Sequence, residues 1–396
     1  MEEIQVKIKN SFAKKYQSGF PLLIKEAIIN VQDLKEEGKL VKVIDERGEF
    51  LGRGYYGRQN KGYGWILTQK ETELFDEAFF HKKISTALNR RSSLYQDDST
   101  TAFRVFNGEG DGIGGVTIDY YDGFYVLSWY SEGVYQFKEL IIESLKSLIE
   151  YKGIYQKKRF DTGGKYIEED DFVIGERGEF PLMVKENGVN FAVYLNEGPM
   201  TGIFLDQRDV RKTIRDKYAK GKTVLNTFSY TGAFSVFAAV GGARKTTSVD
   251  LANRSLEKTK EQFELNNINP DTEDIKVMDV FKYFDFAKKN NITFDMVILD
   301  PPSFARSKKH TFSVAKDYKD LIKDAIAITS LNGMIVASTN YAGFGMDKFK
   351  GFIQKAFNES GGNYSIIETF SLPEDFRTRK DFKEGNYLKV VFIQKK

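Results

Sequence analysis

Residues 224–235 read VLNTFSYTGAFS, and this stretch decides the fold. An apolar strand leads into a tight turn at Gly232, and a helix is predicted to begin near Phe234. In an open sheet of parallel strands, ligands bind at the carboxyl ends of the strands, where the chain passes into a helix. Glycine at that point lets the backbone approach a ligand closely. The stretch therefore predicts a ligand site on an α/β sheet, with a purely structural turn as the alternative.

The glycine content of this turn bears on the kind of ligand. A dinucleotide site needs the spacing Gly-x-Gly-x-x-Gly, which seats a pyrophosphate at the start of a helix. Only Gly232 is present here, so a phosphate cradle is not expected. A single glycine suits a ligand without phosphate groups, such as S-adenosyl-L-methionine.

Strands and helices alternate through residues 186–396. Buried-type strands are predicted at 223–228, 246–250, 275–279, 294–300, 334–338, 364–370 and 387–393. This alternation predicts a parallel sheet with helices on both faces. The last two strands are joined by a long loop without a convincing helix, which predicts an antiparallel final pair. A doubly wound, seven-stranded sheet of this kind is the Rossmann-like architecture of class I methyltransferases.

Carboxylates end the two strands that follow the glycine turn. The second strand ends at Asp250, where a carboxylate can accept both hydroxyls of a ribose. The third ends near Asp279, where a carboxylate can accept the adenine amino group while an apolar neighbour covers the ring. Each acid alone could simply cap a strand end. Their position on successive strands favours a nucleoside-containing ligand.

The fourth strand runs into VILDPPSF at 297–304. Two prolines fix the backbone and remove two N–H donors, so the carbonyls before them can face a ligand. Asp300 and Phe304 then offer an acceptor and a stacking face to a planar base. This string predicts the position of a substrate base.

The first 185 residues carry other patterns. Residues 1–72 alternate apolar and polar positions between glycine-rich turns, which predicts a small β-barrel. Its Gly-Phe-Pro at 19–21 and LGRGYY at 51–56 resemble the PUA domain, an RNA-binding barrel, and a barrel without a ligand is the alternative. Residues 73–185 predict a mixed α/β central domain with no chemical motif of its own. Residues 186–396 complete the chain as the methyltransferase-like domain.

The chain as a whole resembles a bacterial family of ribosomal large-subunit (23S) RNA methyltransferases, which join an N-terminal PUA domain, a central domain and a class I methyltransferase domain. The resemblance rests on residues 103–115, MTGIFLDQR at 200–208, FSYTG at 228–232, and DPPSF at 300–304 with SK at 307–308. The string at 201–208 is the most specific, because no general rule of the fold demands it.

The resemblance implies which residues form the site, and it places those at 204–208 outside the core sheet. We expect S-adenosyl-L-methionine to contact Phe204, Asp206, Gln207, Arg208, Asn226, Phe228, Ser229, Tyr230, Thr231, Gly232, Asp250, Leu251, Asp279, Val280, Phe281 and Asp300. The predicted catalytic residues, which would face the target base, are Asp300, Pro301, Pro302 and Phe304.

One departure from the family pattern concerns the nucleophile. Members that make 5-methylcytosine attack the base with a cysteine after the fifth strand, whereas this chain has no cysteine and Thr339 takes that position. A threonine hydroxyl is a far weaker nucleophile unless a base activates it. Related enzymes that make 7-methylguanine also lack the cysteine. A ring nitrogen has its own lone pair, so such an enzyme needs positioning and charge stabilisation only.

Composition narrows the remaining possibilities. The 396 residues include 41% hydrophobic and 29% charged ones, which is typical of a globular protein with two or three domains. No cysteine and only two histidines mean that no disulfide and no metal site are expected. The chain lacks both an apolar run of about 18 residues and a signal-peptide layout, so we expect no membrane association and a cytoplasmic location.

The net charge of +3 says little about partners, but basic residues gather locally. The clusters are Lys157–Arg159, Arg208 to Lys217, Lys308–Lys309 and Arg377 to Lys383. A single cluster is usually a solvated face, whereas several near one site indicate nucleic-acid binding.

These patterns predict methyl transfer from S-adenosyl-L-methionine to a base of large-subunit ribosomal RNA, and they favour a nitrogen over carbon 5 of cytosine as the acceptor. The alternatives are a 5-methylcytosine enzyme by family analogy, a methyltransferase of small molecules or proteins, and a non-catalytic RNA-binding or ribosome-assembly protein with a vestigial site. The target nucleotide and the oligomeric state are left open, a homodimer included.

Overall fold

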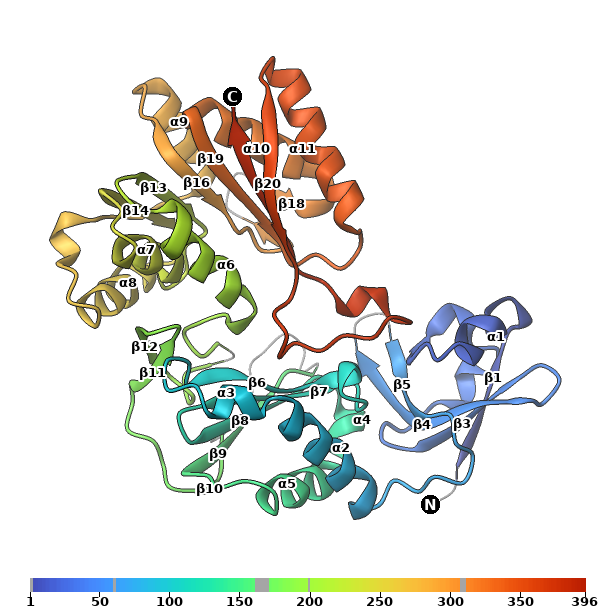
Figure 1. The fold of residues 1–396 in the computed structure, drawn as a ribbon. Coiled ribbons are helices and arrows are strands. Elements are labelled where there is room, and N and C mark those ends of the chain that lie inside the picture. The colour runs from blue at the N-terminus through green and yellow to red at the C-terminus, as the bar shows by residue number, and fades with distance from the viewer. Residues whose placement is uncertain (1–2, 60–61, 161–170, 199, 307–310) are drawn as a thin grey trace. The chain divides into compact units, whose positions relative to one another are not determined.

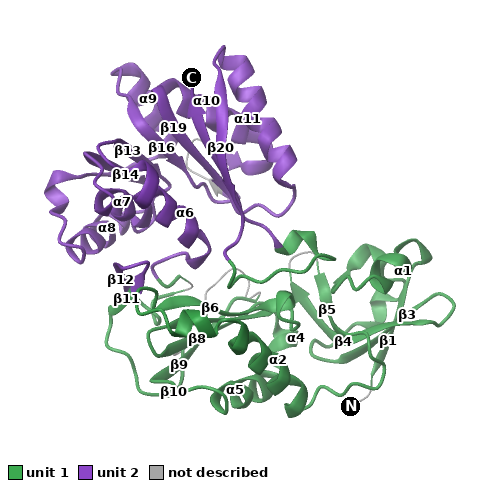
Figure 2. Cartoon of the chain, in the orientation of Figure 1, with its two compact units in different colours: residues 1–184, 193–201, 374–385 green, residues 185–192, 202–373, 386–396 purple. Residues whose placement is uncertain are grey.

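A computed structural model describes residues 3–59, 62–160, 171–198, 200–306 and 311–396 (Figure 1). The chain divides into two compact units (Figure 2). Unit 1 comprises residues 1–184, 193–201 and 374–385, and unit 2 comprises residues 185–192, 202–373 and 386–396. The functional division at 1–72, 73–185 and 186–396 stays a prediction, because these units are defined by packing alone.

Unit 2 is built on a seven-stranded sheet in the order β15-β14-β13-β16-β19-β21-β20. The strands are β13 (Thr223–Thr227), β14 (Lys245–Asp250), β15 (Asp274–Val277), β16 (Phe294–Leu299), β19 (Thr329–Thr339), β20 (Tyr364–Phe370) and β21 (Lys389–Lys395). Pairing is parallel from β15 to β19, and β21 is antiparallel to both neighbours. The predicted Rossmann-like sheet with a reversed final strand is confirmed.

Helices cover both faces of this sheet. They are α6 (Arg208–Thr213), α7 (Ala233–Val240), α8 (Ser255–Glu264), α9 (Val280–Lys289), α10 (Val314–Ile328) and α11 (Met346–Ser360). Successive strand residues point to opposite faces, so Leu225 packs in the cluster with α9, α10 and α11, whereas Val224 packs in the cluster with α6 and α7. A hairpin of β17 (Phe304–Arg306) and β18 (Thr311–Ser313) follows β16.

Unit 1 contains two five-stranded sheets. The N-terminal curled sheet has the order β1-β3-β4-β5-β2, from β1 (Ile4–Ile8), β2 (Leu22–Ile24), β3 (Leu40–Asp45), β4 (Phe50–Gln59) and β5 (Gly62–Thr68), with α1 (Asn10–Gln17). The central sheet has the order β10-β9-β8-β7-β6, from β6 (Ala102–Asn107), β7 (Val116–Tyr121), β8 (Phe124–Trp129), β9 (Gly153–Lys158) and β10 (Phe172–Gly175). Its helices are α2 (Glu77–Arg90), α3 (Ser92–Tyr95), α4 (Glu132–Tyr135) and α5 (Lys138–Lys146). β11 (Leu182–Glu186) and β12 (Val189–Val193) form a separate two-stranded sheet.

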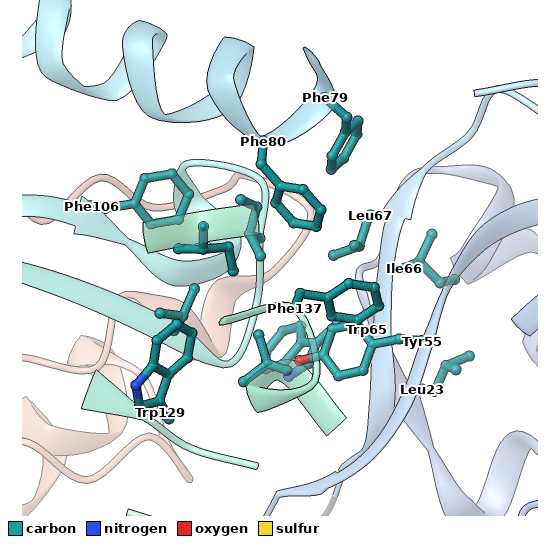
Figure 3. Close-up of a cluster of buried hydrophobic side chains, with 14 of the residues drawn as sticks. Leu23, Tyr55, Trp65, Ile66, Leu67, Phe79, Phe80, Phe106, Trp129 and Phe137 are labelled. Atoms are coloured by element: carbon teal, nitrogen blue, oxygen red, sulfur yellow. The ribbon is translucent and has the colours of Figure 1, made fainter. Parts of the chain in front are cut away.

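One hydrophobic cluster joins the two sheets of unit 1 (Figure 3). Tyr55 of the curled sheet lies 5.7 Å from Phe137, and Phe137 lies 5.6 Å from Phe80 of α2, measured between ring centroids. The side chains of Tyr55 and Phe80 are completely buried. The predicted barrel and central domain therefore share one core, and removal of either would expose the apolar surface of the other.

The connection between β20 and β21 also belongs to unit 1. Residues 374–385 leave the seven-stranded sheet and pack in unit 1, where Phe382 contacts Phe20 and Trp65 with ring centroids 5.5 and 5.7 Å apart (Figure 2). The sequence predicts a long loop here but does not indicate where the loop packs. Among the described residues, no helix combines the length and apolar character needed to cross a membrane.

Candidate active site

A cavity of about 350 Å³ lies at the carboxyl ends of β13, β14, β15 and β16. The sequence-predicted residues that line it are Phe204, Asp206, Gln207, Phe228, Ser229, Tyr230, Thr231, Asp250, Leu251, Asp279, Val280, Phe281, Asp300, Pro301 and Pro302. Four further predicted residues, Arg208, Asn226, Gly232 and Phe304, are not part of its wall, whereas Arg211, Ala233, Phe234 and Asn340 line it without having been predicted. The structure thus gathers most of the predicted residues around one cavity.

The loop after β13 follows an unusual backbone path along the cavity. Phe228 and Tyr230 have φ values of 54° and 51°, a left-handed conformation that costs side-chain-bearing residues energy. The loop is held there because the Ser229 N–H donates to the Val249 carbonyl at 3.1 Å and the Tyr230 N–H donates to the Asp250 carboxylate at 2.9 Å. Gly232, with φ 79°, begins α7. A strained backbone that hydrogen bonds stabilise beside a cavity is typical of a ligand-binding loop.

The carboxylates of Asp250 and Asp279 each accept hydrogen bonds from the backbone and keep further acceptor positions. The Asp250 oxygens accept from the Tyr230 and Ala252 N–H groups, both at 2.9 Å. The Asp279 Oδ1 caps α9 by accepting from the Phe281 N–H at 3.0 Å. An ionised carboxylate has about four acceptor positions, so both side chains keep positions for a ligand. The strand-capping role and the ligand role suggested by the sequence are compatible in one side chain.

Asp300 is held in a buried polar network at the end of β16. The Gln207 Nε2 donates to the Asp300 Oδ1 at 3.0 Å and to the Ser338 Oγ at 2.8 Å. Burial raises the pKa of the Asp300 carboxyl to about 6, hydrogen bonding to Ser338 opposes the increase, and the negative charge of Asp206 adds to it. A carboxyl with a raised pKa in a cavity is a typical mark of a functional position.

Arg211 lies in the cavity wall with its charge already paired. Its guanidinium donates twice to Glu186, at 2.7 Å each, and once to the Phe204 carbonyl at 2.7 Å. Arg211 and Glu186 are both buried. This bidentate pair fixes the backbone around Phe204 and leaves the cavity with little free positive charge.

The charge of the cavity selects the kind of ligand. Among the described residues that line it, four are aspartates and one is an arginine. A phosphate group would be repelled by such a wall, whereas a sulfonium and an ammonium group would be attracted. The buried Gln207 Oε1 also has no hydrogen-bond partner among the described residues, so it can accept from an ammonium group of a ligand. The residues present therefore fit S-adenosylmethionine.

The prolines and Phe304 extend from the cavity toward solvent. Pro301 is buried, Pro302 is exposed, and the Phe304 side chain is 60% exposed. The Ser303 hydroxyl donates to the Asn340 Oδ1 at 2.7 Å, which leaves the Asn340 amide hydrogens for another acceptor. Residues 307–310, which include the predicted basic pair Lys308–Lys309 and the Ser307–Lys308 string, lie outside the described residues.

Thr339 does not contribute to the cavity wall. It is the last residue of β19, its side chain is completely buried, and its hydroxyl accepts from the Tyr341 N–H at 3.2 Å. The next residue, Asn340, is exposed and lines the cavity. A base in this site would therefore meet an amide, and the hydroxyl of Thr339 is already engaged.

The partly buried Asp300 carboxylate is expected to cost folding stability. The folded protein holds the pKa near 6 instead of the ordinary 3.8, so stability falls as pH rises from about 4 to 6. At neutral pH the raised pKa corresponds to a cost of about 3 kcal/mol. Asp300→Asn should therefore be more stable than the parent at neutral pH by up to about 3 kcal/mol, and denaturant unfolding across this pH range measures it. Equal stability with an unchanged pH profile would contradict the prediction.

Comparison with known proteins places this fold and site in a family. The sequence profile of the S-adenosylmethionine-dependent methyltransferases matches residues 165–380, and that of the PUA-like domain matches residues 6–69. The chain is 61% identical over 391 residues to Bacillus subtilis YwbD, provisionally named a ribosomal RNA large subunit methyltransferase, covering 98% of this chain and 99% of YwbD. It is 32% identical, over 98% of both chains, to ribosomal RNA large subunit methyltransferase I of Alteromonas mediterranea.

A solved structure supports the same assignment. The protein SMU.776, provisionally described as a methyltransferase and crystallised with SAH (S-adenosylhomocysteine), matches with a TM-score of 0.90, 39% identity and complete coverage of both chains. The chain is thus an S-adenosylmethionine-dependent methyltransferase. It belongs to the family of ribosomal RNA large subunit methyltransferases in which that domain follows a PUA-like domain.

Proposed function

We propose that this protein transfers a methyl group to a base of large-subunit ribosomal RNA and that the acceptor atom is a nitrogen. The relatives' names and the PUA-like domain support the RNA substrate. The observation that favours a nitrogen is the absence of a thiol, because the chain has no cysteine and Thr339 is buried outside the cavity wall.

The site suits a base turned out of its helix. A paired base hides its reactive edge, so an enzyme that modifies it must extrude it into a pocket. The exposed ring of Phe304 offers a stacking face, which contributes on the order of 1–3 kcal/mol per base. Asp300 and the Asn340 amide offer an acceptor and a donor to the edge of such a base.

S-adenosylmethionine supplies an electrophilic methyl group when it is bound. Asp206, Asp250, Asp279 and Gln207 are the residues proposed to hold it, by charge and by hydrogen bonding. Asp300 then orients the base and, as a carboxylate, stabilises the positive charge that develops on a ring nitrogen as it gains a methyl group. The hydrogen bond from Gln207 holds the Asp300 carboxylate in place, so its geometry need not change during the reaction.

Nucleoside mass spectrometry of ribosomal RNA tests this proposal. RNA from a strain lacking the protein should lose one N-methylated nucleoside, and expression of the parent chain should restore it. Expression of Asp300→Ala should not. Loss of 5-methylcytosine instead would exclude the nitrogen, and no loss of any methylated nucleoside would exclude ribosomal RNA as the substrate.

A further inference from the structure

Unit 1 contains a second cavity, of about 570 Å³. The end of β5, one face of α2, the turn at 109–112 and the segment 374–385 form its wall. All of its lining residues belong to unit 1, whereas the cofactor cavity is lined only by residues of unit 2. The proposed methyl transfer makes no use of this second cavity.

The wall is fixed by direct packing of backbone on backbone. A Cβ atom on Gly110 would lie 1.8 Å from the Arg377 carbonyl oxygen, so only glycine permits this approach. The Asn107 Nδ2 donates to the same carbonyl at 2.8 Å. Farther along the segment, the Arg379 guanidinium donates to the Gly19 carbonyl at 2.8 Å. These contacts place Arg377 and Arg379 at the cavity.

One of the three acidic residues of the wall, Asp111, is already paired with arginines. The buried Asp111 carboxylate accepts from both Arg91 Nη atoms, at 2.7 and 3.2 Å, and from the Asn107 N–H at 2.8 Å. Arg90 lies 3.5 Å from the same carboxylate and shares it with Arg91. Arg379 pairs with Asp381 at 2.7 Å. The Asp111 carboxylate is therefore shared between Arg90 and Arg91.

Four cations of the wall have no ion pair within the described residues, namely Lys70, Lys82, Lys83 and Arg377. Burial lowers the pKa of the Lys83 ammonium, with only Glu73 as an opposing carboxylate, and the charges of Arg379 and other cations lower it further. An anion in the cavity would relieve this repulsion.

Glu109 adds a different group to the same wall. Burial raises the pKa of its carboxyl to about 7, and the carboxyl is an acceptor beside the cations. A simple phosphate site has no use for an acceptor that would repel the ligand. A nucleotide site can use such an acceptor, because the base presents N–H donors while the phosphates contact the cations.

We propose that this cavity is a second RNA site, in which Lys82, Lys83 and Arg377 hold the phosphodiester backbone and Glu109 accepts from a base of an unpaired segment outside the methylated nucleotide. The proposal rests on RNA being the substrate. An unpaired segment is required because sequence-specific contacts in RNA are made mainly to bases free of a helix.

The test compares two double variants of equal charge change. Lys82→Gln with Lys83→Gln removes two cavity cations, and Lys138→Gln with Lys146→Gln removes two lysines of α5 in the same unit. The probe is a transcript of large-subunit ribosomal RNA, and its dissociation constant is measured over a series of potassium chloride concentrations. The cavity variant should bind about 10-fold more weakly at low salt, and its slope of log affinity against log salt should fall by about 1.4, since each single-strand contact contributes about 0.7. Cofactor affinity should be unchanged.

A third variant tests the base contact. Glu109→Ala, which removes both acceptor oxygens, should weaken binding of the transcript without changing the salt slope, and inorganic phosphate should compete far less well than a short single-stranded RNA. Equal behaviour of the two double variants would overturn the site while leaving the RNA substrate intact. Full competition by inorganic phosphate would overturn the base contact. If the parent protein does not bind the transcript, the proposed function fails first.

Discussion

Asp300→Ala should lower kcat by about 100-fold or more when S-adenosylmethionine is saturating. Removal of one preorganised electrostatic group from an active site has an effect of this size. Asp300 is proposed to act on the base, and its partly buried carboxylate is positioned by Gln207. Turnover of a ribosomal RNA fragment under saturating cofactor measures the change. A variant with near-parental kcat would remove Asp300 from the proposed mechanism.

Thr339→Ala is the matched control for this experiment. Its buried hydroxyl accepts only a local N–H bond among the interactions described, so the variant should keep substantial turnover. RNA carrying 5-fluorocytosine should form no denaturant-resistant complex with the parent enzyme, because a hydroxyl cannot replace the thiolate of a covalent adduct. A stable complex would overturn the nitrogen acceptor but not the methyltransferase assignment.

Asp250→Ala should weaken S-adenosylmethionine binding by about 1.5–3 kcal/mol, the scale of hydrogen bonds to a charged group. The carboxylate is proposed to accept the ribose hydroxyls, and it also holds the Tyr230 N–H in the strained loop. Asp250→Asn keeps one acceptor oxygen and should lose less affinity than the alanine variant. Calorimetric titration measures both. Unchanged affinity in the alanine variant would move the ribose away from Asp250.

The sequence predicts the seven-stranded sheet because each strand carries its own local signal. Strand ends such as Asp250 and Asp300 are predictable for the same reason, since parallel strands bring their carboxyl ends to one edge. Asn340 could have been found by this rule, because it lies two residues after the strand predicted at 334–338 and directly follows β19. Arg211, four residues after the cavity-lining Gln207 that caps the same helix, could have been found from helical periodicity.

Other features depend on contacts between distant parts of the chain. Nothing in residues 374–385 indicates that they pack in unit 1, because the glycine that admits Arg377 is Gly110. From the sequence alone, Lys82 and Lys83 are expected on the solvated face of a helix. The structure instead has them line a cavity together with the turn at 109–112. The shared core of the two sheets in unit 1 is likewise invisible to local patterns.

Because residues 374–385 pack in unit 1, the folding of this unit cannot be completed until these residues have been synthesised. The hydrogen bond from Arg379 to Gly19 joins residues 360 positions apart. Contacts of such separation form late, because the entropy of closing the chain must be overcome first. Since domains otherwise begin to fold while the ribosome is still extending the chain, a nascent or truncated product has an unfinished unit 1 that lacks Phe382 and Arg377. The proposed RNA contact of Arg377 therefore requires a chain that extends through this segment.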